Sequence, residues 1–260
     1  MFEFPNDALS VLRDHDLLPD GHRCVFAGGS LIRGWGNATS DIDVFVVLDE
    51  PAGVASTISA PVGLDAGAVH VRSVYVDGRR WDVEYWLESQ IAQLLEKVSP
   101  SEFASGKDIG LWLTPHEVDF LDKFSSSQLL HGGDWFEQWR GRLEASAYRS
   151  VVAVRALDYY DNYAEDVVGQ LATGDTESAV LSAKAAFGYA IDGVLALYGE
   201  FGSGTKWRAR RFLAAQPKEM SFDDYWAFET MRTFDPAFPE RWPEEVLLFC
   251  RDLCSKVDVG

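Results

Sequence analysis

Two aspartates separated by one residue, Asp41 and Asp43, introduce an apolar run in the sequence DIDVFVVL, residues 41–48. The run is rich in β-branched and aromatic residues, which are typical of a strand. Because side chains of a strand alternate between its faces, both carboxylates are expected on one face and Ile42 on the other. Two carboxylates this close repel each other and resist burial, so a cation should lie between them. Mg²⁺ suits this position, because it prefers carboxylate oxygens and is often held by one or two carboxylates together with substrate phosphates.

A second pair of acids, Asp82 and Glu84, follows in the segment WDVEY, residues 81–85, and shares one face of another expected strand. A strand that carries an acid beside Asp41 and Asp43 would complete a three-carboxylate site for one or two Mg²⁺ ions. Such a site holds a nucleoside triphosphate and stabilises charge during phosphoryl transfer. An isolated D-x-D motif has a simpler interpretation, an exposed strand start that carries acidic residues.

A glycine-serine turn, Gly29-Ser30, precedes Asp41 with ten residues between the serine and the aspartate. Glycine allows the backbone to approach a phosphate closely, and backbone N–H groups together with a serine hydroxyl bind phosphate oxygens. The turn is therefore the expected partner of the carboxylates in triphosphate binding.

Taken together, these motifs resemble the nucleotidyltransferase superfamily that includes DNA polymerase β, in the minimal form of the aminoglycoside nucleotidyltransferases. The family pattern is an apolar strand, G-S, about ten residues, D-x-D, and later an acid between apolar residues. In this chain it reads VFAGGSLIRGWGNATSDIDVFVV and then WDVEYW, within residues 22–90, about a third of the chain.

The resemblance implies roles for individual residues. Asp41 and Asp43 match the catalytic, metal-binding pair, and Glu84 matches the third metal-binding carboxylate, with Asp82 as the alternative. The residues that match the triphosphate-binding segment of family members are Gly29, Ser30, Arg33 and Ser40.

In that family, C-terminal helices cover the nucleotide and build the acceptor pocket, often with a carboxylate base and a lysine that meets phosphate. Asp161 is the candidate base here; its alternatives Asp158 and Asp166 lie in the same expected helix, and a solvated acidic helix face is the simpler interpretation of all three. Lys184 and Lys206 are the candidate phosphate ligands. Lys206 and its neighbour Arg210 have simpler roles available, in helix capping or in solvating the surface.

The pattern of elements predicts an α+β fold. Strands are expected at 22–29, 41–48, 69–76 and 79–87, the last two joined by an Asp77-Gly78 hairpin turn, whereas the Pro- and Gly-rich segment 50–67 reads as an irregular connection. From residue 135 onward the periodicity is helical, first as one long helix over 135–171 and then as shorter ones. We expect a nucleotidyltransferase α/β domain with a mixed sheet over residues 1–130, followed by an α-helical bundle over residues 131–260.

Composition limits the partners. The 260 residues carry a net charge of −18, which disfavours nucleic acid and favours a cationic acceptor. No apolar run of about 20 residues and no signal peptide is apparent, so no membrane association is expected. Three cysteines, an odd and small number, suit a reducing cytoplasm.

The expected reaction is Mg²⁺-dependent transfer of a nucleoside monophosphate from an NTP, with ATP as the expected donor, to a hydroxyl of a small-molecule acceptor, such as a cationic aminoglycoside. The expected assembly is a monomer or a homodimer. Two alternatives stay open: an antitoxin-type nucleotidyltransferase that modifies a protein, and a catalytically silent nucleotide-binding module. A template-directed or tRNA-end polymerase is least favoured, because of the charge.

Overall fold

The structure is a computed structural model, which describes residues 4–5, 7–51, 58–106, 113–202 and 204–257. The chain divides into two compact units, Met1–Ser146 and Ala147–Gly260. The boundary expected from the sequence was at residues 130/131. Helix α6 (Gly133–Glu144) belongs to the first unit, where the ring centroid of its Phe136 lies 5.9 Å from that of Phe26 in β1.

The first unit is built on a six-stranded sheet whose strands lie in the order β3-β4-β5-β2-β1-β6. Strands β2 and β5 are parallel and the other neighbours antiparallel, so the sheet is mixed and the unit is α+β. The strands are β1 (His22–Gly28), β2 (Ile42–Leu48), β3 (Ile58–Pro61), β4 (Ala68–Val76), β5 (Arg79–Leu87) and β6 (Gln128–His131).

The two faces of the sheet carry different cores, because alternate side chains of β2 and β5 point to opposite sides. One face is mainly aliphatic, with Ile42, Val44 and Val83 buried together with residues of α1 (Ala8–Asp14), although Trp81 and Tyr85 belong to the same core. The other face is aromatic: Phe26 and Phe45 stack with ring centroids 5.0 Å apart. Further helices of the unit are α2 (Gly29–Ile32), α3 (Glu88–Lys97), α4 (Pro100–Ala104) and α5 (Pro115–Ser125).

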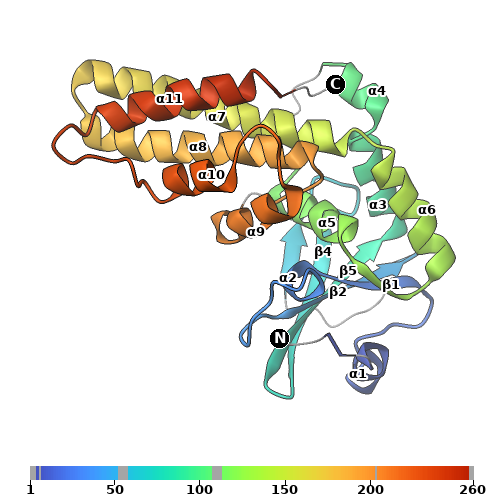
Figure 1. Cartoon of the computed structure of the whole chain (residues 1–260). Helices are drawn as coiled ribbons and strands as arrows, with labels where there is room; N and C mark the ends of the chain where they lie inside the picture. The colour runs from blue at the N-terminus through green and yellow to red at the C-terminus, as the bar shows by residue number, and fades with distance from the viewer. Residues whose placement is uncertain (1–3, 6, 52–57, 107–112, 203, 258–260) are drawn as a thin grey trace. The chain divides into compact units, whose positions relative to one another are not determined.

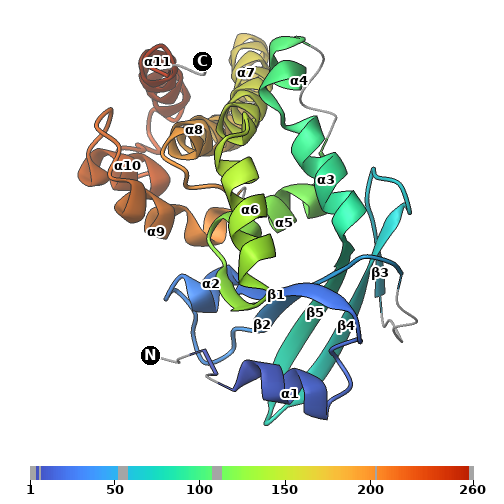
Figure 2. The same cartoon turned by 90° about the vertical axis from the view of Figure 1, so that its right-hand side faces the viewer.

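Helices α5 and α6 cover the aromatic face, and Figure 2 shows them on the side of the sheet opposite α1. Phe120 and Phe124 of α5 and Phe136 of α6 lie with their ring centroids 5.0–6.2 Å from that of Phe26. The acid-bearing side of β2 therefore faces α5, which explains why α5 supplies partners to the site described below.

The second unit consists of helices, with α7, α8 and α11 side by side in Figure 1. Gly193 permits close packing of α8 on α7, since a Cβ at this position would lie 3.2 Å from Leu157 Cδ2. The helices are α7 (Tyr148–Thr173), α8 (Thr176–Leu197), α9 (Thr205–Ala215), α10 (Phe222–Glu229) and α11 (Arg241–Cys254).

Helix α8 corrects one expectation from the sequence. Its 22 residues are long and apolar enough to cross a membrane by length and composition alone, although no such run was expected. In the structure, 72% of its apolar window is buried inside the protein, and the helix forms the centre of the bundle. A core helix surrounded by other helices is apolar on every side, which accounts for its hydropathy.

Three other local expectations also differ from the structure. The segment expected to be irregular contains β3, a short edge strand that ends in Pro61, where a missing N–H is tolerated. Strand β6 was not expected. The single long helix is two helices, α6 and α7, which separate at Ala145–Ala147 because α6 buries its apolar residues in the first unit and α7 in the second.

Candidate functional site

The central strand β2 places the Asp41–Asp43 pair at the edge of the aromatic face. Asp43 pairs in register with Gly28 of β1 on one side and with Asp82 of β5 on the other. Asp41 directly precedes the strand, and its charge helps to raise the pKa of the Asp43 carboxyl. The two aspartates thus influence each other across one pleat, as the alternation predicts.

Gly29 lies directly against Asp43. Its φ is +79°, in the left-handed region that favours glycine. A Cβ on Gly29 would lie 2.1 Å from Asp43 Oδ2, a distance that no side chain allows. The structure therefore brings the glycine turn and the metal-binding candidate into direct contact, as the sequence motifs imply for a triphosphate site.

Lys123 of α5 is the basic partner of Asp43. Its Nζ donates to Asp43 Oδ1 at 3.1 Å and lies 2.8 Å from Asp119 Oδ2. Burial raises the pKa of Asp43 to about 6, because the charged form loses water, although the Lys123 ammonium acts in the opposite direction. Burial alone would lower the pKa of Lys123, but the charges of Asp43, Asp119 and Glu84 outweigh it and raise this pKa.

Arg80 joins the other two acids at this end of the sheet. Its guanidinium donates to Asp41 and lies 2.9 Å from Asp82 Oδ2. Ser73 of the neighbouring strand donates to Asp82 Oδ1 at 2.6 Å. Asp82 is thus opposite Asp43 in register and shares a cation with Asp41.

Glu84 lies one pleat further along β5, opposite Phe45, and is buried. Trp86 Nε1 donates to Glu84 Oε2 at 2.9 Å, and His116 Nε2 lies 3.2 Å from the same oxygen. Burial alone would raise the pKa of Glu84, but the neighbouring His116 and Lys123 and the Trp86 hydrogen bond together lower it. For His116, burial alone would lower the pKa, but the adjacent Glu84 carboxylate outweighs this effect, so the pKa is raised.

The donor set fits a divalent ion held by two carboxylates. Asp41 and Asp43 supply hard oxygen ligands on one face, and Mg²⁺ often takes its remaining ligands from water and substrate phosphates. Over the described part of the chain, no group of three or more His, Cys, Asp or Glu side chains is gathered as metal ligands. The choice between Asp82 and Glu84 as a third ligand stays open: Asp82 is nearer the pair in register, whereas Glu84 is engaged by His116 and Trp86.

The other predicted ligands from the first unit stabilise the loop between β1 and β2. The guanidinium of Arg33 lies 3.8 Å from the centroid of the Trp35 ring. The carbonyl of Ser30 accepts from Trp35 N at 2.8 Å, and Ser40 Oγ accepts from Asn37 N at 2.9 Å. These contacts fix the course of the segment that connects the glycine turn to Asp41.

Asp161 belongs to the second unit, where it is exposed and lines a groove between α7 and α11. The groove has a volume of about 670 Å³ and is lined by both apolar and charged side chains. Its lining residues are Tyr160, Asp161, Ala164, Glu165, Val168, Glu244, Leu247, Leu248 and Arg251.

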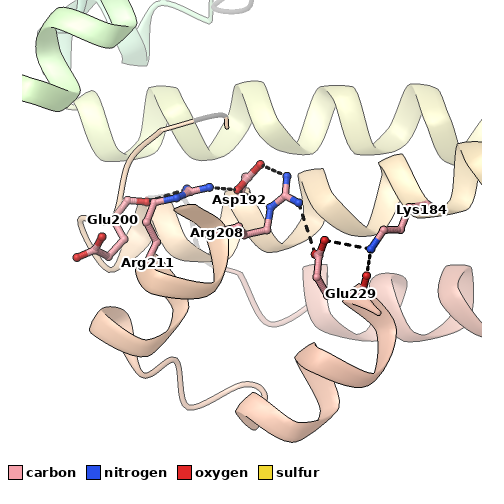
Figure 3. Close-up of polar contacts among 6 residues, drawn as sticks. All are labelled: Lys184, Asp192, Glu200, Arg208, Arg211 and Glu229. Atoms are coloured by element: carbon pink, nitrogen blue, oxygen red, sulfur yellow. Dashed lines mark hydrogen bonds and ion pairs between the residues drawn. The ribbon is translucent and has the colours of Figure 1, made fainter. Parts of the chain in front are cut away.

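Lys184 and Lys206 have different surroundings in the second unit. Lys184 is part of a buried ion network (Figure 3), in which its Nζ lies 3.0 Å from Glu229 Oε1 and also donates to the Glu229 carbonyl. Lys206 is exposed, 5.0 Å from the centroid of the Trp207 ring. A phosphate would therefore compete with the Glu229 carboxylate for the ammonium of Lys184. Lys206 lies outside this network, so its ammonium is not engaged by Glu229.

The network itself centres on Asp192 of α8, which accepts from two guanidiniums of α9. Arg208 Nε and Nη2 donate to its two oxygens at 3.0 and 2.9 Å, and Arg211 Nη2 donates at 2.5 Å. Arg208 Nη1 also lies 3.5 Å from Glu229 Oε2 (Figure 3). All four side chains are at most 12% exposed, so the segment KWRARR is partly interior, not a basic surface patch.

Sequence reasoning missed the basic partners Lys123, Arg80 and His116. Two signals for them were present. In the segment PHEVDFLDKF, His116, Asp119 and Lys123 recur at helical spacing and share one face of α5. In RRWDVE, Arg80 has the same strand parity as Asp82. Neither pattern identifies which acid each basic residue meets, because the pairing depends on how the elements pack.

No family model and no curated protein matches the sequence. Among solved structures, the fold is similar to that of a nucleotidyltransferase-like protein from Exiguobacterium sibiricum 255-15. The similarity has a TM-score of 0.51 and covers 97% of this chain and 75% of the other, at 11% sequence identity. At this identity the similarity concerns the fold: the chain has the α+β architecture of a nucleotidyltransferase-like protein.

Proposed function

We propose that the protein is a Mg²⁺-dependent nucleotidyltransferase that moves a nucleoside monophosphate from an NTP, with ATP as the expected donor, to a hydroxyl of a small-molecule acceptor, with release of pyrophosphate. The observation that carries the proposal is the contact between Gly29 and Asp43, where a glycine turn with φ +79° meets the carboxylate of the D-x-D pair. A phosphate-binding turn and a metal-binding carboxylate have to be this close if one triphosphate is to engage both. The similarity in fold supports the same class of reaction.

In this proposal, Asp41 and Asp43 hold Mg²⁺, with Glu84 or Asp82 as a third carboxylate. Mg²⁺ supplies Lewis-acid stabilisation of the charge that develops on the phosphoryl oxygens. The backbone of Gly29 and the hydroxyl of Ser30 would bind the triphosphate beside these carboxylates. Catalysis then depends on positioning and electrostatics more than on covalent chemistry of the protein.

Three residues of the helical unit complete the proposal. Asp161 would remove the proton from the acceptor hydroxyl, and Lys184 and Lys206 would bind phosphate. The net charge of −18 favours a cationic acceptor of the aminoglycoside kind, because an acidic protein attracts cations. These assignments follow from the resemblance in sequence motifs and are tested one by one by substitution to Asn or Met.

The test is transfer of label from each of four α-labelled NTPs, with Mg²⁺, to aminoglycosides and to the small-molecule and protein fractions of a cell extract. Asp43→Asn should abolish the transfer, whereas Asp49→Asn, in an exposed ion pair with Arg23, should leave it unchanged. Label in a small molecule that disappears with Asp43→Asn supports the proposal. Label that enters only protein would replace it with a protein-modifying activity.

A second candidate, a silent nucleotide-binding module, is favoured by one observation. All four candidate metal-binding carboxylates already have a basic partner in the protein: Arg80 for Asp41 and Asp82, Lys123 for Asp43, and His116 for Glu84. This function predicts that NTP binds with Mg²⁺ and that no label leaves the nucleotide with any acceptor fraction. Transfer by the wild type together with loss in Asp43→Asn would eliminate it.

A further inference from the structure

Lys123 is the basic side chain that contacts Asp43 in the candidate site. It is four-fifths buried, and its ammonium lies between Asp43 Oδ1 at 3.1 Å and Asp119 Oδ2 at 2.8 Å. The lysine therefore places a fixed positive charge on one oxygen of the carboxylate that the proposed function assigns to a divalent ion.

The backbone of α5 also brings Lys123 close to Gly28, at the start of the glycine turn. A Cβ on Gly28 would lie 3.0 Å from Lys123 Cβ and 3.3 Å from the Lys123 carbonyl oxygen. The other oxygen of Asp43, Oδ2, faces Gly29, where a Cβ would lie 2.1 Å from it. The two oxygens thus have different neighbours: Oδ1 faces the ammonium, and Oδ2 faces the turn.

These contacts have an electrostatic consequence. A divalent cation on Asp43 would lie within a few ångströms of the ammonium, in a site where burial weakens solvent screening. The repulsion lowers the affinity of the bare protein for the ion. A triphosphate on the neighbouring turn would offset this repulsion, because its negative charge lies beside both cations.

We propose that Lys123 couples the binding of the divalent ion to the binding of nucleotide, by acting as a resident counter-ion of Asp43 that keeps ion affinity low until a triphosphate occupies the Gly28–Gly29 turn. This inference rests on the proposed function. It assigns Lys123 as a positioning residue that acts through Asp43 and the ion. Coupling of this kind is reciprocal: the ion raises nucleotide affinity by the same factor by which nucleotide raises ion affinity.

The experiment measures the Kd of Mn²⁺ by electron paramagnetic resonance, with and without a non-hydrolysable ATP analogue, for the wild type and Lys123→Met. Every variant is measured at the same fixed pH, so that a difference in Kd reflects the substitution. Lys123→Met should bind Mn²⁺ alone about tenfold more tightly than the wild type, and the analogue should then improve Mn²⁺ binding by a smaller factor.

Two further variants separate charge from structure. Lys123→Arg keeps a positive charge and should bind Mn²⁺ as the wild type does. Lys97→Met removes a comparable ammonium from a buried carboxylate of the same unit, Glu117 at 3.2 Å, and should leave the Kd of Mn²⁺ unchanged. Lys123→Gln replaces Lys123→Met if the methionine variant does not fold, as judged by circular dichroism.

Two results would overturn the inference, and they differ in meaning. If the wild type and Lys123→Met bind Mn²⁺ within twofold of each other while Asp43→Asn loses binding, the coupling role is wrong and the metal site stands. If neither protein binds Mn²⁺ with or without the analogue, the proposed function itself fails, and the inference fails with it.

Discussion

Removal of the Asp192 carboxylate should destabilise the helical unit strongly. In Asp192→Ala, Arg208 loses both of its bonds to α8, and Arg211 loses its bond at 2.5 Å. What remains is the pair of Arg208 with Glu229 at 3.5 Å and a bond from Arg211 to the Glu200 carbonyl at 3.4 Å. Two guanidiniums, 8% and 3% exposed, would then lack their principal counter-charge.

The size of the effect follows from the cost of an uncompensated buried charge. Removing one partner of a buried ion pair costs about 3–5 kcal/mol. The two remaining contacts reduce this cost, while a second guanidinium that also loses its counter-charge increases it, so about 3–5 kcal/mol is expected for the variant. For a unit of roughly a hundred residues, this corresponds to a decrease in Tm on the order of 10–20 °C.

The assay is native-state hydrogen exchange of peptides from α8 and α9, because it reports on the helical unit alone, and a two-unit chain need not unfold in one step. The matched control is Lys256→Met, which breaks an exposed pair with Asp252 at 2.7 Å and should change the free energy of opening by less than about 0.5 kcal/mol. If Asp192→Ala costs less than about 1 kcal/mol, the ion network does not stabilise the unit and the reasoning is refuted.

Three more outcomes are expected. Gly29→Ala should abolish Mn²⁺–nucleotide binding, because its Cβ would meet Asp43 Oδ2 at 2.1 Å, whereas Gly34→Ala, also at positive φ but with open space around it, should retain binding; calorimetry distinguishes them. Gly188→Ala should lower the free energy of unfolding by about 1–3 kcal/mol more than Gly169→Ala does, as measured by thermal unfolding. The reason is that a Cβ at residue 188 would lie 2.9–3.1 Å from the Arg208 guanidinium, whereas a Cβ at residue 169 meets nothing within 4 Å. Equal effects would mean that the guanidinium moves freely. Burial raises the pKa of the thiols of Cys24, Cys250 and Cys254. None of them should therefore react with a disulfide reagent at pH 8 within minutes unless denaturant is added. Rapid labelling of the native protein would contradict the burial.

Local chemistry made part of the fold predictable. The hairpin between β4 and β5 follows from Asp77-Gly78, and both residues have positive φ, as the favoured two-residue hairpin turn requires. Asp175 caps α8 through a bond from Ser178 N at 3.2 Å, as its type and position predict. In both places the decisive interaction lies within a few residues of the sequence pattern that predicts it.

The expectations that failed depend on distant parts of the chain. Strands β3 and β6 have four residues each and exist because β4 and β1 offer free edges for pairing. The separation of α6 from α7 has no local breaker such as proline. It follows from burial of the two helices in different units, which periodicity within one segment cannot reveal.

The candidate site shows the same division between local and distant information. Asp41 and Asp43 were predicted to share a face, and this follows from strand alternation alone. The cation expected between acids so close is supplied in part by the protein, from Arg80 after a hairpin and from Lys123 on a helix 80 residues further along the chain than Asp43. Only the packing of α5 on the sheet brings that ammonium to the carboxylate.

The acidic and basic side chains at the site are unequal in number. The acids joined by these contacts are Asp41, Asp43, Asp82, Glu84 and Asp119, and their basic partners are Arg80, Lys123 and His116. Five acids thus face three basic side chains, so the protein's own cations leave part of the acidic charge without a partner. The proposed function requires this imbalance, because a divalent ion is attracted to a site only where acids outnumber the resident cations.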